Sequence, residues 1–191
     1  IRLLSDHPET VIRYILALDA ELNEHLVTPD EVRTHDRAVL AEVEAELPGS
    51  RAKTDLKALV SVLHRRAELL GLVEEYRALK HRWGLIDFSD QIALVARLAQ
   101  QHPDVGQTER ETYRVVLLDE YQDTSVAQAR LLSRLFSGAD PASGRGHPVM
   151  AVGDPNQAIY GWRGASVSNI IGFGRDFPAA QLLREQLLHQ Q

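Results

Sequence analysis

The chain has 191 residues, of which 44% are hydrophobic, and a formal net charge of −6. This length predicts one large domain, or one domain with a small module, and the apolar content is sufficient for a buried core. The sequence contains no cysteine, which excludes disulfides, zinc–thiolate sites and iron–sulfur clusters within this chain. The acidic balance disfavours an extensive DNA-coating surface but allows a narrow groove that uses a few aromatic residues and arginines.

The sequence also bears on where the protein acts. No apolar run reaches the roughly 18 residues of a membrane span, and no segment has the charged-then-apolar form of a signal peptide. We therefore expect a cytoplasmic protein with no membrane partner. The eight histidines are scattered, without the paired spacing of a metal site. Because the first residue is Ile1 rather than Met, we further expect that a longer protein was cut at this point.

Residues 8–83 have a helical pattern with no strand signal and no catalytic motif. Apolar residues with a period of 3.6 predict a first helix over residues 11–22. The segment 28–31 is typical of a helix N-terminus with a capping box, and the helix it opens should end near residue 48. A third helix should cover residues 55–83, where Gly71 could break it in two. We expect residues 1–84 to form an all-helical packing module.

The pattern changes to strand–helix–strand after Gly84. Asp87 and Asp90 occupy the N-cap and N3 positions of a helix predicted over residues 92–98. Short apolar, β-branched runs predict two buried parallel strands, with a helix and a loop between them. These elements are predicted at residues 113–118 (strand), 126–136 (helix), 137–148 (loop) and 148–152 (strand). Acidic residues at the carboxyl ends of such strands are typical of α/β proteins that bind ligands there.

The first strand delivers two adjacent carboxylates, Asp119 and Glu120, to its carboxyl end. A strand-end aspartate can hold Mg²⁺ beside a nucleotide phosphate, because Mg²⁺ takes oxygen ligands and keeps several waters. A neighbouring glutamate can orient a water molecule and accept its proton. Two other interpretations fit these residues: a solvated acidic turn, and a metal-dependent nuclease site built on Asp119, Glu120 and Asp123.

The second strand ends in a Gly-Asp-Pro turn, which should place Gln157 near the first motif. An amide at that position can contact a phosphate or a water molecule through hydrogen bonds. Tyr160, Trp162 and Arg163 follow within a few residues, and nucleic-acid bases stack on aromatic faces with about 1–3 kcal/mol per contact. The alternative is that both aromatic residues belong to the core and that the arginine is paired in a salt bridge.

Taken together, residues 119–123 (Asp-Glu-Tyr-Gln-Asp) and residues 153–165 (Gly-Asp-Pro-Asn-Gln-Ala-Ile-Tyr-Gly-Trp-Arg-Gly-Ala) resemble the second and third conserved motifs of UvrD/Rep-type superfamily 1 DNA helicases. Residues 87–90 are similar to the Asp-Phe-x-Asp element of that family. The sequence of residues 117–125 is similar to that of actinobacterial members, including helicase–nuclease subunits of the AdnAB kind.

The resemblance implies an α/β fold of two parts. Residues 85–191 would be a partial RecA-like P-loop NTPase domain that carries the second and third motifs, and residues 1–84 would be the all-helical subdomain inserted into it. The implied activity is that of an ATP-dependent translocase on single-stranded DNA, which unwinds duplex DNA in repair or recombination. The implied partners are single-stranded DNA, duplex junctions and the remaining motor domains, and a nuclease partner is compatible with it.

Individual roles follow from the same resemblance. Asp119 would hold Mg²⁺ beside ATP, Glu120 would activate the attacking water, and Gln157 would sense the γ-phosphate. The DNA contacts would come from Tyr160 and Trp162.

Arg163 would link the nucleotide and DNA sites.

Besides the nuclease, a non-catalytic DNA- or nucleotide-binding fragment remains an alternative. An ATPase that acts on proteins would explain the two carboxylates but not the aromatic run.

Two features of the sequence depart from the family pattern. The phosphate loop, Gly-x-x-x-x-Gly-Lys-Ser/Thr, is missing, since the chain contains no Gly-Lys pair. In the family this loop precedes the helical insertion. The later Asn-Tyr-Arg motif is also not matched, because residues 182–191 read Leu-Leu-Arg-Glu-Gln-Leu-Leu-His-Gln-Gln. No nucleotide role is transferred to Arg184.

We therefore expect the 191-residue chain by itself to hydrolyse no ATP. The phosphate loop supplies the backbone amides and the lysine that cradle the phosphates, and this sequence has neither. Phosphate release measured with and without single-stranded DNA should stay at the buffer background. DNA-stimulated turnover by the purified chain would contradict this expectation.

Overall fold

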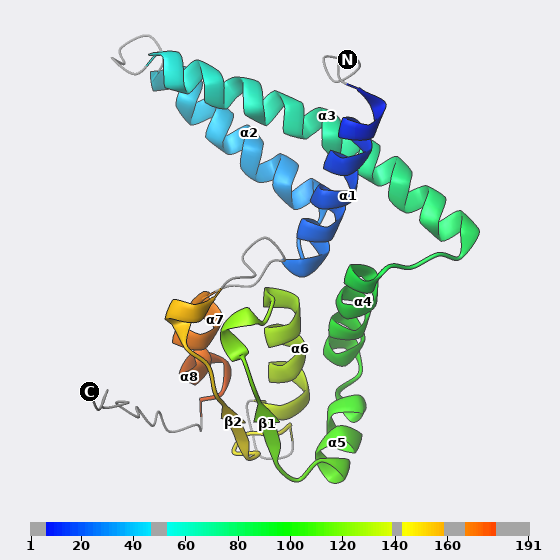
Figure 1. Ribbon diagram of the computed structural model, residues 1–191, viewed down its shortest axis with the longest axis vertical. Coiled ribbons are helices and arrows are strands. Elements are labelled where there is room, and N and C mark those ends of the chain that lie inside the picture. The colour runs from blue at the N-terminus through cyan, green and yellow to red at the C-terminus, as the bar shows by residue number, and fades with distance from the viewer. Residues whose placement is uncertain (1–6, 47–52, 139–142, 159–166, 179–191) are drawn as a thin grey trace. The chain divides into compact units, whose positions relative to one another are not determined.

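The computed structural model describes residues 7–46, 53–138, 143–158 and 167–178 (Figure 1). The chain divides into two compact units, Ile1–Gln91 and Ile92–Gln191. No helix within the described ranges is long and apolar enough to cross a membrane. The fold is mostly helical with one small parallel sheet, which is compatible with part of a helicase domain.

Three helices pack together in the described part of the first unit, and their buried apolar side chains form its core. Figure 1 shows α2 lying alongside α3, and α1 also packs on α3. The core consists of Leu22, Leu70 and Val73. The bounds are α1 Pro8–Glu24, α2 Pro29–Glu46 and α3 Lys53–Trp83.

The helix α3 is continuous, so Gly71 does not break it in two, as the sequence had left open. A glycine inside a helix is less favourable than alanine by about 1 kcal/mol. Leu70 and Val73 flank this glycine and are both completely buried, so packing on each side offsets that cost. The predicted capping box of α2 is confirmed: the backbone N–H of Glu31 donates to Thr28 Oγ1 at 3.3 Å, and that of Thr28 donates to Glu31 Oε2 at 2.7 Å.

A capping box also begins α4, which spans Phe88–Gln101. The backbone N–H of Asp90 donates to Asp87 Oδ1 at 2.9 Å, and the backbone N–H of Asp87 donates to Asp90 Oδ2 at 3.0 Å. The predicted N-cap and N3 positions are therefore confirmed, although the helix is longer than the predicted 92–98. Burial acts to raise the pKa of Asp87, but hydrogen bonds from the Asp90 N–H and from Lys80 outweigh it, and that pKa lies below its usual value.

A buried charge network joins α1, α3 and the start of α4. Lys80 Nζ lies 2.6 Å from Asp19 Oδ2, 2.9 Å from Asp87 Oδ2 and 2.7 Å from Asp90 Oδ2. Asp19 is 1% exposed and also accepts a hydrogen bond from Arg77. These three carboxylates are close enough to hold a metal ion. The ammonium group already contacts all three, so it supplies the positive charge that the cluster needs.

Helices and a two-stranded sheet form the second unit. The strand β1 pairs in parallel with β2, with Leu117 opposite Met150, and α5 packs on α6. The bounds are α5 Pro103–Thr112, β1 Val116–Leu118, α6 Val126–Phe136, β2 Val149–Ala151, α7 Val167–Ile171 and α8 Phe173–Asp176, with short 3₁₀ helices η2 Tyr121–Asp123 and η3 Pro155–Gln157. The bounds of α6 coincide with the prediction, and Ser125 and Gln128 form its capping box.

The prediction that both strands are buried is wrong. Leu117 is 71% exposed and Met150 is 55% exposed, and their register places them on the same face of the sheet. Both strands are also shorter than predicted. The strand β1 begins only at Val116. The Tyr113 carbonyl pairs with the ring of His147, whose Nε2 lies 2.8 Å away, and not with a neighbouring strand. Pro148 has no N–H to donate to the ladder, so β2 begins one residue later.

We expect Lys80→Met to destabilise the first unit by about 3 kcal/mol or more, because removing one member of a buried ion-pair network leaves the other charges buried and uncompensated. Urea unfolding monitored by circular dichroism measures the change. Lys57→Met is the matched control, since Lys57 lies on the exposed face of α3. Equal stability of the two variants would show that the network contributes nothing.

Candidate functional site

The parallel pairing brings the ends of β1 and β2 to the same edge of the sheet. The pairing continues past both strands: the Val152 N–H donates to the Leu118 carbonyl at 2.8 Å, and the Tyr121 N–H donates to the Val152 carbonyl at 3.0 Å. The two predicted motif loops, residues 119–123 and 153–157, are therefore held against each other. Figure 1 shows the two strands side by side.

The first loop presents two carboxylates to solvent. Asp119 and Glu120 are both exposed, and the Glu120 N–H donates to Asp119 Oδ1 at 2.9 Å. The backbone of Glu120 is left-handed, with φ 50° and ψ 40°. That conformation is unfavourable for a residue with a side chain, and such residues cluster at functional sites. The backbone thus turns sharply at the position predicted to carry the general base.

The second loop is organised around Asp154. Its carboxylate accepts hydrogen bonds from the Asn156 N–H and from Gln157 Nε2, both at 2.9 Å. These two hydrogen bonds hold the pKa of Asp154 below its usual value, and the bond from the Gln157 amide has the larger effect. Gln157 is exposed, as a ligand-contacting amide should be. In this structure its amide is bonded to Asp154 and not to the first loop.

A buried amide, Gln122, connects the two loops, a role that was not predicted from the sequence. Gln122 is 1% exposed. Its Nε2 donates to Glu120 Oε2 at 2.6 Å, and its Oε1 accepts from the Asp154 N–H at 3.1 Å. A glutamine between acidic residues looks like a solvated position in a sequence. The available signal was its fixed place in the motif that residues 119–123 resemble.

Residues of two short helices, α7 and α8, contact η2 and the residue that follows it. Tyr121 is buried and packs edge-on against Phe173, with ring centroids 5.3 Å apart. Burial, with a smaller contribution from Asp176, raises the pKa of Tyr121 to about 12. The buried Asn169 donates from Nδ2 to the Thr124 carbonyl at 2.7 Å. Neither α7 nor α8 was predicted from the sequence, and neither were these anchoring contacts.

The predicted DNA-contacting residues Tyr160, Trp162 and Arg163 lie outside the described residues. Their roles stay predictions. The roles of Asp119, Glu120 and Gln157 also stay predictions, because no bound nucleotide tests them.

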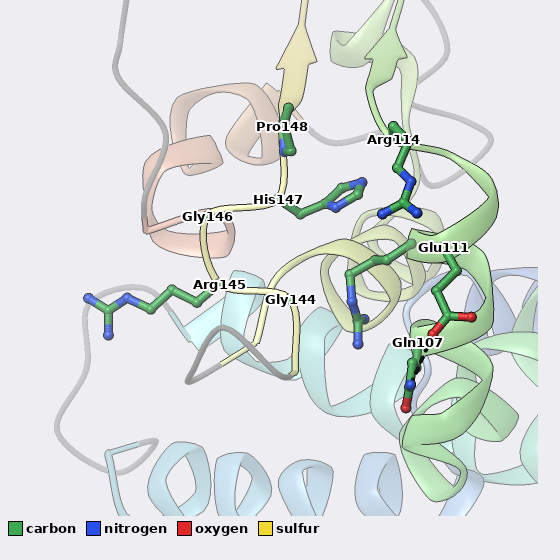
Figure 2. A pocket seen from close by; sticks show the side chains of 9 residues that line it. Gln107, Glu111, Arg114, Gly144, Arg145, Gly146, His147 and Pro148 are labelled. Atoms are coloured by element: carbon green, nitrogen blue, oxygen red, sulfur yellow. Dashed lines mark hydrogen bonds between the residues drawn. The ribbon is translucent and has the colours of Figure 1, made fainter.

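A polar pocket of about 320 Å³ lies near the opposite end of the sheet, where β1 and β2 begin (Figure 2). Its lining includes Arg110, Arg114, Arg145 and His147. Arg110 donates to the Leu135 carbonyl in α6, and Figure 2 shows Arg145 pointing away from Arg114 and His147. Because these arginine and histidine side chains do not converge on one point, we assign no ligand to this pocket.

Comparison with known proteins identifies the class. Residues 12–178 match the UvrD/REP helicase N-terminal domain, and the chain belongs to this family. The resemblance seen in the two motifs is thereby confirmed.

Several helicases are similar to this chain. It is 31% identical over 182 residues to DNA helicase II of Rickettsia typhi, which covers 94% of this chain and 25% of the relative. It is 31% identical over 179 residues to ATP-dependent DNA helicase Rep of Escherichia coli, covering 88% and 24%. DNA helicase II of Escherichia coli is 40% identical over 111 residues, covering 58% and 14%. The chain thus spans a quarter or less of the length of these relatives.

Proposed function

We propose that this chain is part of an ATP-dependent DNA helicase that moves along single-stranded DNA and unwinds duplexes in repair or recombination. One observation carries the proposal: two exposed carboxylates at the end of β1 lie beside a loop that presents an exposed amide, in a chain of the UvrD/REP family. On this proposal residues 85–191 form part of a RecA-like P-loop NTPase domain, and residues 1–84 form its inserted helical subdomain.

The residues at the strand end fit ATP and Mg²⁺. The Asp119 carboxylate is exposed and offers the oxygen ligand that Mg²⁺ prefers. When bound, the ion neutralises charge on the β- and γ-phosphates. Glu120 would accept the proton of the attacking water. Gln157 would contact the γ-phosphate, which requires that its amide exchange the Asp154 carboxylate for a phosphate oxygen.

The proposed DNA contacts follow directly after this loop. Tyr160 and Trp162 would stack on bases of single-stranded DNA, and Arg163 would connect the two sites. Because only Ala158 and Ile159 lie between Gln157 and Tyr160 in the sequence, a displacement of η3 would shift the residues proposed to contact DNA. Duplex junctions and the remaining motor domains of the full-length protein would complete the set of partners.

The geometry does not favour the alternative of a metal-dependent nuclease. Such a site needs several carboxylates that converge on one ion. Across the described ranges, the group of acidic residues that converges within 4.8 Å is Asp19, Asp87 and Asp90, not the residues at the strand end. Asp123 also has one carboxylate oxygen buried.

We expect Glu120→Gln, made in the full-length protein that carries this sequence, to lower the ATP turnover rate by orders of magnitude and to leave nucleotide binding nearly unchanged. The amide keeps the size of the side chain but cannot accept a proton. Single-turnover phosphate release and titration with a fluorescent ATP analogue measure the two quantities. Glu111→Gln on α5 is the matched control, and a single-turnover rate close to wild type in Glu120→Gln would exclude Glu120 as the base.

A further inference from the structure

We propose that Gln122 is a positioning residue, which orients the Glu120 carboxylate and couples it to the loop of Asp154. This inference rests on the proposed function, in which Glu120 is the general base. The motivating observation is a completely buried amide that bonds to one loop with its donor and to the other loop with its acceptor.

The two partners of Gln122 call for one donor and one acceptor, which a neutral amide supplies in a single side chain. The Glu120 carboxylate offers only acceptors and the Asp154 N–H is a donor, so the residue between them must donate on one side and accept on the other. The opposite orientation of the amide would set its oxygen against the carboxylate and its NH₂ against the N–H. An ionised glutamate could still accept from Asp154, but it would repel Glu120. A hydrophobic side chain of similar volume would leave the Asp154 N–H without its partner.

Gly153 allows the two loops to approach this closely. A Cβ atom at this position would lie 2.4 Å from Gln122 Oε1 and 2.8 Å from Ile170 Cδ1. Both distances are far below van der Waals contact, so any larger residue would displace the amide or α7. The glycine serves here through its lack of a side chain, which lets the Asp154 N–H reach the amide oxygen.

The hydrogen bonds provide a path from the phosphate-contacting loop to the base. Gln157 is bonded to Asp154 through both its side chain and its backbone N–H, each at 2.9 Å. A change in the position of Gln157 therefore changes the position of Asp154, whose N–H holds the Gln122 amide. That amide in turn holds Oε2 of Glu120 and leaves Oε1 for a water molecule.

The test is made in the full-length protein with the variants Gln122→Met and Gln122→Glu. We expect Gln122→Met to lower kcat by about 10- to 100-fold, the range seen when an outer residue that orients a reacting group is lost. The KM for ATP should change little, because the nucleotide contacts are retained. Gln107→Met, at an exposed amide on α5, is the matched control.

The variant Gln122→Glu separates positioning from a merely structural role. It places a second carboxyl group against Glu120, and two carboxyl groups at this distance share a proton. The acidic limb of the pH profile of kcat should therefore move to higher pH by about one unit or more, since that profile reports the groups essential in the enzyme–substrate complex. A structural role would lower the melting temperature and leave the profile of the remaining activity in place.

The outcomes distinguish this inference from the proposed function. If Glu120→Gln keeps its single-turnover rate, the proposed function fails and this inference fails with it. If Glu120→Gln is inactive while both Gln122 variants keep the wild-type kcat and pH profile, only the positioning role is overturned. Should Gln122→Met fail to fold, the pH profile of Gln122→Glu decides, because its protonated form has the same donor and acceptor as the native amide.

Discussion

The candidate site depends on the parallel pairing of β1 with β2. Only parallel strands end at the same edge of a sheet, and here the pairing continues through the Val152 N–H to Leu118 and through the Tyr121 N–H to Val152. The residues after each strand are therefore fixed beside each other by backbone hydrogen bonds. The register also sets which side chains share a face, so a slip of one residue would move the loop of Gln157 away from the carboxylates of the first loop.

The two units stabilise buried polar groups in different ways. Between the motif loops a neutral amide, Gln122, bonds to one acceptor and one donor, so this buried side chain brings no charge of its own. In the first unit a charged lysine, Lys80, is surrounded by three carboxylates and lies over the ring of Tyr76. Each arrangement satisfies the buried group, as required where water cannot replace a lost partner.

Local chemistry explains which features the sequence predicted. The helix α6 and the start of α4 are specified by capping residues a few positions apart, and their predicted positions are confirmed. Features that depend on distant contacts were not predicted. Gln122 is buried where Gly153, distant in the sequence, lies against it, and α3 continues through Gly71 between the buried residues Leu70 and Val73. The short helices α5, α7 and α8 have too few apolar positions to show a period.

The central claim is that the two loops form one nucleotide-binding unit. A structure of the full-length protein with Mg²⁺ and a non-hydrolysable ATP analogue tests it most directly. The account predicts the ion at the Asp119 carboxylate and the Gln157 amide on the terminal phosphate, with its hydrogen bond to Asp154 released. A triphosphate and ion bound away from the ends of β1 and β2, for example in the pocket of Arg114 and His147, would contradict it.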